Sequence, residues 1–277
     1  MRRTEFPCVD GARAIAAFAV VLHHAAGTGL LLAGPDFAPR PVRHVATMLG
    51  QVGVAAFFVL SGFLLYRPFV SSHLDGGRPP GAGRFWVRRG ARILPGYWLA
   101  FAGAVALGTA WFARPRWLFY ALNLGLLQSY RRDGVIYFGL GVAWTLVIEA
   151  SFYAAVPCIA AVVRGVARRR GARPVRAEVV GLLLVAVTGI TVRTFWILRL
   201  RDRAGSPGPW FPLRQLGYWL PAYLDWFAIG MLLAVGSAWA SRGGRMPKVV
   251  RALADRTAVC WALAALALWG LTRSGYP

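Results

Sequence analysis

Acidic residues are scarce in this chain of 277 residues, which holds 10 aspartates and glutamates against 32 lysines and arginines. Charged residues of both signs make up only 15% of the sequence, whereas an ordinary soluble domain has roughly 25%. Long polar stretches are missing as well, because the longest runs for about 25 residues, too few for a folded domain. The shortage of charge and of polar sequence excludes an ordinary soluble protein.

Cysteine is also rare. The three cysteines are Cys8, Cys158 and Cys260, and none of them lies within metal-binding or redox spacing of another. We therefore expect inert thiols and no bound metal.

What the chain has instead is apolar sequence, with 57% hydrophobic residues and a mean hydropathy of +0.52. An intrinsically disordered chain would lack this apolar content. A nucleic-acid-binding protein could carry the net charge of +22, but not several apolar runs of about 20 residues, each long enough to cross a bilayer. The sequence therefore predicts a multi-pass membrane protein and no nucleic-acid partner.

The apolar runs predict seven long membrane spans and one shorter segment. The seven runs cover residues 12–34, 45–66, 93–112, 135–163, 177–198, 217–240 and 257–273. The shorter stretch, 117–128, has about 12 residues and is re-entrant, steeply packed inside the bundle or one half of a broken span. We expect an all-α, polytopic transmembrane helix bundle that forms a single domain over residues 1–277.

The distribution of basic residues predicts the orientation of this bundle. Three segments, 67–92, 164–178 and 242–256, hold six, six and five of them. The positive-inside rule places these segments and the N-terminus on the cytoplasmic side, provided that the shorter apolar stretch does not cross the membrane. Lys248 is the one lysine among the basic residues, which is typical of a GC-rich genome. We therefore expect the inner (plasma) membrane of a bacterium.

The first span carries ionisable side chains, which are costly in a bilayer and therefore mark a candidate functional site. His24 lies eleven residues after Arg13, on the same helical face and about 16 Å deeper, near the middle of the membrane. An imidazole at that depth can act as a general base. It can equally be a structural histidine that is hydrogen-bonded between helices.

The fourth span carries Glu149, on one helical face with Thr145 and Tyr153. A carboxylate in apolar surroundings must pair with a cation or hold a proton, and His24 and Arg13 are the candidate partners. A catalytic role and a structural ion pair that joins two helices are both open.

Three further spans contain weaker signals. Ser61 lies between Gly53 and Gly62 in an aliphatic run, so its hydroxyl can serve a reacting group, or these small residues simply allow close helix packing. Arg193 and Asp225 lie in consecutive spans, and we expect a structural ion pair between them.

An arginine cluster precedes the third span. Arg88 and Arg92 are four residues apart, so on a helix they form a two-pronged clamp for phosphate, with Arg89 beside them. The alternative is a positive-inside anchor that contacts anionic lipid head groups. Pro95 suits the first turn of the next helix or a kink.

Five blocks, in order along residues 8–235, resemble the bacterial membrane acyltransferases of the O-antigen acetylase and Nod-factor acetylase type, acyltransferase family three. The blocks are VDGARAIAAFAVVLHH, GVAAFFVLSGFLL, RRGARILPGYW, WTLVIEASFYAAVP and PAYLDWFAIGMLLA. Asp10, Gly11, Arg13, His24, Arg89, Arg92 and Pro95 stand at matching positions. Ala14 replaces a usual glycine and Thr145 a usual serine. The family usually has about ten membrane helices, so the resemblance implies that the last helices are lacking here.

The resemblance implies an enzyme that transfers an acyl group, most often acetyl, from cytosolic acetyl-CoA to a hydroxyl of a carbohydrate or lipid-linked glycan at the outer side. Acyl-CoA would be the donor co-substrate, and no metal is implied. In this hypothesis Arg88, Arg89 and Arg92 bind the phosphates of CoA.

The same hypothesis gives roles to five residues inside the membrane. His24 deprotonates the acceptor hydroxyl or transiently carries the acyl group. Glu149, or Arg13 through a hydrogen-bond chain, orients the imidazole. Ser61 or Tyr153 stabilises the oxyanion.

Two other classes of protein compete with this interpretation. A multi-pass transporter or flippase would move an anionic or lipid-linked substrate past the same intramembrane residues, and a regulatory membrane protein would bind anionic lipid through its arginines. A transporter generally shows paired repeats with broken helices at matching positions, and we find none in the sequence. A lipid anchor has no need of a histidine near the middle of the membrane. Both observations favour the acyltransferase.

Overall fold

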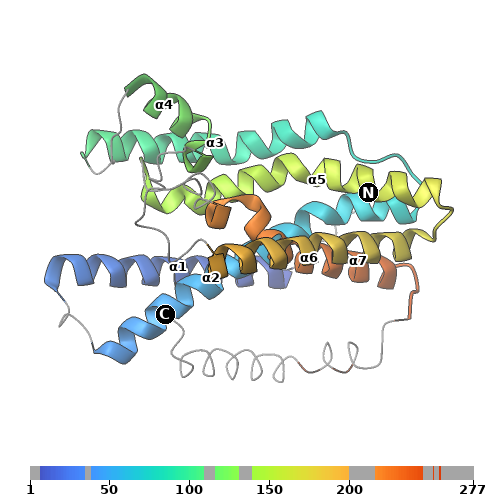
Figure 1. The fold of residues 1–277 in the computed structure, drawn as a ribbon, viewed down its shortest axis with the longest axis horizontal. Coiled ribbons are helices and arrows are strands. Elements are labelled where there is room, and N and C mark those ends of the chain that lie inside the picture. The colour runs from blue at the N-terminus through green and yellow to red at the C-terminus, as the bar shows by residue number, and fades with distance from the viewer. Residues whose placement is uncertain are drawn as a thin grey trace. The chain divides into compact units, whose positions relative to one another are not determined.

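The computed structural model of the chain describes residues 7–34, 39–108, 116–130, 139–199, 216–245, 252 and 256. Within these ranges every regular element is a helix (Figure 1). The α-helices are α1 (Pro7–Ala33), α2 (Arg40–Leu74), α3 (Ala82–Ala106), α4 (Arg116–Leu124), α5 (Trp144–Arg169), α6 (Pro174–Arg199) and α7 (Leu224–Ala240). Short 3-10 turns are η1 (Gln128–Tyr130), η2 (Gly141–Ala143) and η4 (Leu220–Tyr223). The all-α prediction is confirmed.

Four stretches of the described helices are long and apolar enough to cross a membrane: Val42–Leu74, Gly141–Arg170, Pro174–Arg199 and Leu220–Ala240. They correspond to the second, fourth, fifth and sixth expected spans. The first and third expected spans form α1 and α3, helices of 27 and 25 residues, and their crossing of the membrane stays a prediction. The seventh, 257–273, lies outside the described residues.

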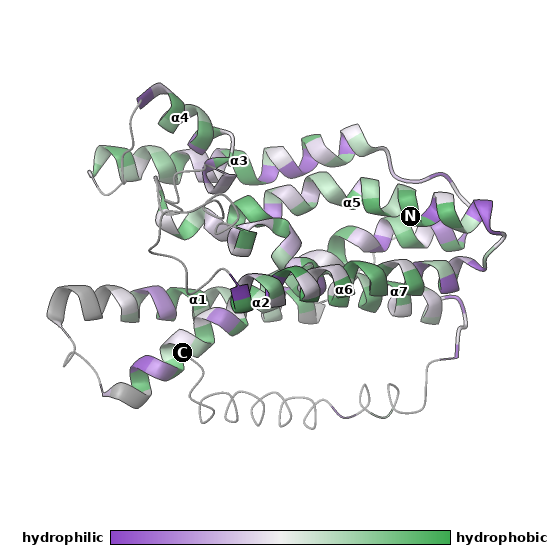
Figure 2. Cartoon of the chain, viewed as in Figure 1, coloured by the Kyte–Doolittle hydropathy of each residue, from purple (hydrophilic) through white to green (hydrophobic). Residues whose placement is uncertain are grey.

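Apolar residues predominate along the long helices (Figure 2). On α6 five large aliphatic side chains are between 48 and 64% exposed: Val180, Leu183, Leu184, Val187 and Ile190. Soluble monomeric proteins rarely expose apolar surface over such a length, whereas the hydrocarbon of a bilayer requires it. The helices are therefore suited to contact with lipid.

The short apolar stretch forms α4, whose nine residues extend for about 14 Å and cannot cross a membrane alone. Its C-terminal end is held by α3, because the hydroxyl of Tyr97 donates to the carbonyl of Asn123 at 2.9 Å. The indole of Trp98 donates to the carbonyl of Leu124 at 3.0 Å. These two bonds fix α4 beside the last turns of α3, where Figure 1 also places it.

Helices extend beyond the apolar runs that predicted them. α2 continues to Leu74 and α3 begins at Ala82, so the connection between them is 75–81 and most of the basic segment 67–92 is helical. Pro95 lies inside α3, so its predicted place in the first turn of a helix is wrong. The reason is that hydropathy ends where a helix leaves lipid, whereas its hydrogen bonds continue through polar residues and tolerate the one bond that proline removes.

Two other predicted starts are too early. The span expected from residue 135 becomes α-helical at Trp144, and the span expected from 217 becomes α-helical at Leu224. A 3-10 turn precedes each helix, and residues 131–138 lie outside the described part of the chain.

Contacts divide the chain into two compact units. One consists of Ser61–Ala238, and the other of Met1–Leu60 with Trp239–Pro277. In the second of these, α1 packs on α2 at glycines, because a Cβ on Gly53 would lie 2.8 Å from the carbonyl of Ala16 and one on Gly50 would overlap the ring of His23. Close helix packing at Gly53, one of the two alternatives that the sequence leaves open for this segment, is observed.

In the larger unit, α2, α5 and α7 meet at one level. A Cβ on Gly62 would overlap the carbonyl of Phe227, and the ring of Phe227 stacks on that of Phe152 with centroids 3.9 Å apart. Both phenylalanines are fully buried. This close approach brings Ser61, the neighbour of Gly62, against α5.

Candidate active site

Glu149 accepts two hydroxyl hydrogen bonds on one oxygen. Ser61 Oγ donates to Glu149 Oε1 at 2.7 Å, and Tyr153 OH donates to the same atom at 2.6 Å. Ser61 comes from the middle of α2, whereas Glu149 and Tyr153 are one turn apart on α5. Three of the five residues predicted for catalysis therefore meet at a single carboxylate.

The carboxylate lies in apolar surroundings. Val147, Ile148 and Phe152, on the same turns of α5, are each fully buried, and Glu149 itself is partly buried. A carboxylate in such a place requires hydrogen bonds or a proton, and the two hydroxyls supply hydrogen bonds. The site can hold, accept or pass a proton.

This arrangement changes what the hydroxyls can do. Both protons are directed at Glu149, so Ser61 and Tyr153 as they stand orient the carboxylate. Each would have to release Glu149 before it could donate to an oxyanion.

His24 and Arg13 both lie on α1, in the other compact unit, and both are partly buried. The continuous helix keeps them on one face, as their spacing predicts. The ring of His24 contacts that of His23 edge to face, with centroids 5.1 Å apart. Their positions relative to Glu149 are not determined, so their pairing with it stays a prediction.

The arginine cluster lies on α3. Arg88 and Arg92 are exposed, one turn apart on the helix, and Arg88 Nε donates to the carbonyl of Arg84 at 3.3 Å. The guanidinium of Arg89 lies over the ring of Phe85, 5.8 Å from its centroid. The helix thus presents Arg88 and Arg92 together on one exposed face, and Arg89 leans back along it.

Two contacts fasten the arginine-bearing turns of α3 to the rest of the larger unit. The indole Nε1 of Trp86 donates to the carbonyl of Tyr153 at 3.1 Å, and the rings of Phe85 and Phe69 meet edge to face at 5.5 Å. Tyr153 therefore bonds the arginine helix through its carbonyl and Glu149 through its hydroxyl.

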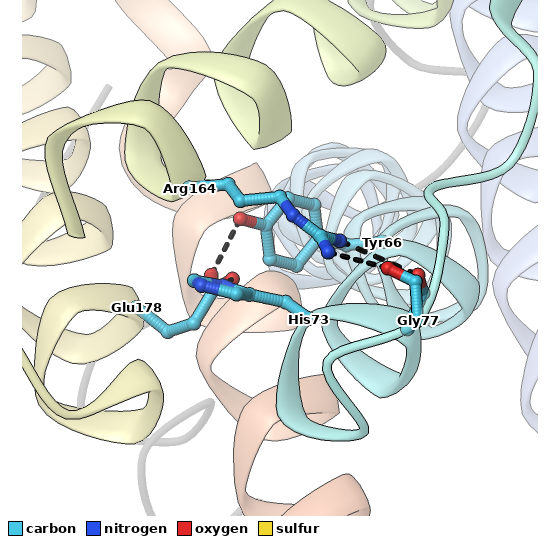
Figure 3. Close-up of polar contacts among 6 residues, drawn as sticks. Tyr66, His73, Gly77, Arg164 and Glu178 are labelled. Carbon is cyan, nitrogen blue, oxygen red and sulfur yellow. Dashed lines mark hydrogen bonds and ion pairs between the residues drawn. The ribbon is translucent and has the colours of Figure 1, made fainter. Parts of the chain in front are cut away.

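A buried polar cluster went unrecognised in the sequence (Figure 3). Tyr66 OH donates to Glu178 Oε2 at 2.6 Å, and His73 Nδ1 lies 2.5 Å from Glu178 Oε1. Tyr66 is fully buried, Glu178 is 1% exposed and His73 is 7% exposed. The signal was present in the spacing of Tyr66, Phe69, Val70 and His73, a buried helical face that continues past the apolar run.

Arg164, which the charge pattern predicts only as part of a cytoplasmic segment, belongs to the same region. It is 8% exposed, and its guanidinium donates to the carbonyl of Gly77 and, at 3.4 Å, to Ser72 Oγ. It links α5 to the connection between α2 and α3 (Figure 3).

The expected pair of Arg193 and Asp225 is confirmed. Arg193 Nη2 bonds Asp225 Oδ2 between α6 and α7, and the guanidinium also lies 5.2 Å from the ring centroid of Trp226. A Cβ on Gly189 would overlap the backbone nitrogen of Asp225, so the two helices touch here.

Aromatic rings gather where α5 and α7 begin and α6 ends. Trp144 lies 5.8 Å from Tyr218 and 6.0 Å from Tyr223, Trp196 lies 6.1 Å from Tyr218, and Tyr223 lies 5.4 Å from Trp226. All five are partly exposed. We call these five residues the aromatic cluster.

Apolar helices that enclose a hydroxyl-bound carboxylate are typical of an integral membrane protein with a polar group in its interior. A family model described as an acyltransferase domain matches residues 6–276. The chain therefore belongs to the membrane acyltransferases of family three.

One curated relative supports the same family. The chain is 27% identical over 256 residues to the acyltransferase MdmB of Streptomyces mycarofaciens. The match covers 84% of this chain and 58% of the relative, so the chain spans little more than half of that protein's length. No solved structure matches the chain.

Proposed function

We propose that this chain is an O-acyltransferase that moves an acyl group, most simply acetyl, from acyl-CoA to a hydroxyl of a carbohydrate or lipid-linked glycan. The observation that carries the proposal is the double role of Tyr153. Its carbonyl bonds the helix that bears the arginine clamp, and its hydroxyl bonds the intramembrane carboxylate Glu149. Tyr153 therefore connects the proposed binding site for an anionic donor with the proposed site of proton transfer.

The donor half of the proposal rests on α3. Arg88 and Arg92, exposed one turn apart, suit the phosphates of CoA, and Arg89 adds a third positive charge beside them. The pantetheine arm is on the order of 15–20 Å long, comparable with the depth of about 16 Å between Arg13 and His24. A donor held at the arginines can therefore carry its thioester into the membrane.

The reaction then needs one base. His24 removes the proton of the acceptor hydroxyl while its oxygen attacks the thioester carbonyl. The tetrahedral intermediate expels the CoA thiolate, which takes up that proton, so the products are an ester and free CoA. Alternatively the acyl group passes to His24 first and to the acceptor second. Glu149, held by its two hydroxyls, or Arg13 orients the imidazole.

The acceptor half of the proposal rests on the aromatic cluster. On α6, Arg176 and Trp196 are twenty residues apart, which is about 30 Å and the thickness of the hydrocarbon core. Because basic ends face the cytoplasm, the aromatic cluster belongs on the outer side, with the N-terminus inside. Partly exposed aromatic rings stack on the apolar faces of sugar rings, which suits a carbohydrate acceptor delivered at the outer leaflet of the bacterial inner membrane.

The test is a thioester-consumption assay in proteoliposomes with labelled acetyl-CoA and candidate glycans. Acceptor-dependent release of free CoA, together with labelled glycan, supports the proposal. The His24→Ala protein should insert normally and lose this activity. Movement of an anionic or lipid-linked substrate without consumption of the thioester would identify a transporter instead. Full acyl transfer by the His24→Ala protein would show that His24 is not the catalytic base.

A further inference from the structure

The connection between α2 and α3 is a turn that is held by hydrogen bonds to the end of α2 and within itself. Asp75 and the glycines after it bond back to α2: the nitrogen of Gly76 bonds the carbonyl of His73 at 3.2 Å, and that of Gly77 bonds the carbonyl of Ser72 at 2.9 Å. Gly76 has a φ of 66°, a conformation that side chains other than glycine rarely adopt. The hydroxyl of Ser72 closes the loop by donating to the carbonyl of Arg78 at 2.6 Å.

Two buried residues from other helices hold this turn and the end of α2 before it. Arg164, on α5, donates to the carbonyl of Gly77 and to Ser72 Oγ. Glu178, on α6, holds the last turns of α2 through Tyr66 and His73. Figure 3 shows both anchors converging on the end of α2.

The anchored turn is joined to the arginine helix by a stiff connection. After Arg78 come Pro79 and Pro80, whose fixed φ angles restrict the chain, and then Gly81, whose carbonyl accepts from the nitrogen of Phe85 in the first turn of α3 at 3.0 Å. The first arginine of α3, Arg84, comes three residues after Gly81. A shift of the turn is therefore passed on to the start of α3 rather than absorbed by a flexible loop.

The chemistry of Arg164 indicates that this residue fixes the turn through specific hydrogen bonds and does more than pack two helices together. A guanidinium that is 8% exposed is costly to bury, and the acceptors it has among the described residues are a neutral carbonyl and a hydroxyl. An apolar side chain of similar size would pack two helices at lower cost. What only the guanidinium supplies is a fork of donors that fixes one carbonyl and one hydroxyl of the turn.

We infer that Arg164 and Glu178 are positioning residues for the donor site: they fix the turn 75–81 and thereby the place of the arginine clamp on α3. The inference rests on the proposed use of acyl-CoA. It predicts that loosening the turn weakens binding of the donor phosphates and leaves the chemical step unchanged, because Glu149 and Tyr153 lie a few turns away on α5 and Ser61 lies a few turns away on α2.

The experiment compares three full-length variants in proteoliposomes under titration with acetyl-CoA. Arg164→Met keeps the apolar stem but removes every donor, and Arg164→Lys keeps the charge and part of the hydrogen bonding. Arg168→Met, one turn further along α5 and exposed, removes the same charge and is the matched control. The KM for acetyl-CoA should rise about tenfold in Arg164→Met and less in Arg164→Lys, with kcat within about twofold of wild type.

A gentler variant covers the case in which Arg164→Met does not insert. Ser72→Ala removes one acceptor of Arg164 and the bond to Arg78, and should raise the KM by about threefold at constant kcat. Amide hydrogen exchange of 75–81 should quicken in both variants, while that of α5 is unchanged.

The outcomes separate two failures. A wild-type protein that shows no saturable use of acetyl-CoA overturns the proposed function, and the inference with it. A wild-type protein that uses acetyl-CoA, with the same KM in Arg164→Met as in Arg168→Met, leaves the function standing and overturns the inference. A loss of kcat at unchanged KM also overturns it, since a merely structural defect would lower the active fraction in that way.

Discussion

Trp86 and Tyr153 connect the arginine-bearing helix to the helix that carries the intramembrane carboxylate, through a bond of 3.1 Å from the indole nitrogen to the backbone carbonyl. The hydroxyl of the same tyrosine bonds Glu149 at 2.6 Å. One residue thus has two separable contacts, one made by the backbone and one by the side chain. Mutations can remove either contact and leave the other.

The first prediction concerns the indole. Trp86→Phe removes the N–H donor and keeps an aromatic ring, so α3 loses its bond to Tyr153 and the arginines lose alignment. We expect the KM for acetyl-CoA to rise about threefold to tenfold, equivalent to one hydrogen bond of about 1 kcal/mol, with little change in kcat. Trp98→Phe is the matched control, because its indole bonds the carbonyl of Leu124 on α4 instead. Equal effects of the two variants would contradict the prediction.

The second prediction concerns the hydroxyl. Tyr153→Phe keeps the carbonyl for Trp86 and removes one of the two donors to Glu149. We expect kcat to fall about tenfold to a hundredfold, because a hydrogen bond to a charged group contributes about 1.5–3 kcal/mol, while the KM for acetyl-CoA stays within about twofold. Tyr130→Phe is the control, since the hydroxyl of Tyr130 also bonds a side chain of α5, that of Ser151, at 2.6 Å. A rise in the KM for acetyl-CoA at constant kcat would contradict the prediction and would show that Tyr153 contributes to donor binding instead of the chemical step.

The third prediction tests whether Ser61 and Tyr153 act as a unit. Both donate to Glu149 Oε1, so removing the second hydroxyl should cost less activity than removing the first, once the carboxylate has already lost its orientation. Ser61→Ala, Tyr153→Phe and the double variant form the cycle, and kcat is the quantity compared. Fully additive losses would show that each hydroxyl serves a different group.

Local spacing was enough to predict part of this site. Glu149 and Tyr153 are four residues apart in an apolar run, so any helix puts them on one face. The pair of Arg193 and Asp225 was predictable for a similar reason, because two opposite charges in consecutive spans have few other partners in lipid.

What escaped the sequence depends on tertiary packing and on helix ends. Ser61 reaches Glu149 because Gly62 lets α2 approach α7, which the linear sequence does not specify. His73 and Glu178 are 105 residues apart and lie in the basic segments 67–92 and 164–178, which the charge pattern places on the cytoplasmic side. The helices continue through both positions and bury them.

The fourth prediction concerns the aromatic cluster. Tyr223→Leu removes a ring that contacts both Trp144 and Trp226 but keeps apolar volume in the turn before α7. If the cluster binds the sugar ring of the acceptor, the KM for the acceptor should rise about fivefold while that for acetyl-CoA is unchanged. Tyr120→Leu, on α4 in a separate aromatic group with Phe101 and Phe119, is the control. An equal rise for both substrates would indicate a general loss of folding instead.

The fifth prediction concerns stability and separates structure from catalysis. Asp225→Leu leaves the guanidinium of Arg193 without its carboxylate, and Arg193→Met leaves a carboxylate that is 7% exposed without its cation. Each single variant should lower the free energy of unfolding by about 2–3 kcal/mol, somewhat less than for a fully buried pair because Arg193 is 29% exposed. The double variant should recover most of the loss, since an apolar pair no longer requires charge compensation. Thermal unfolding in one detergent measures all four proteins. A double variant as unstable as the sum of the single variants would show that the two residues do not depend on each other.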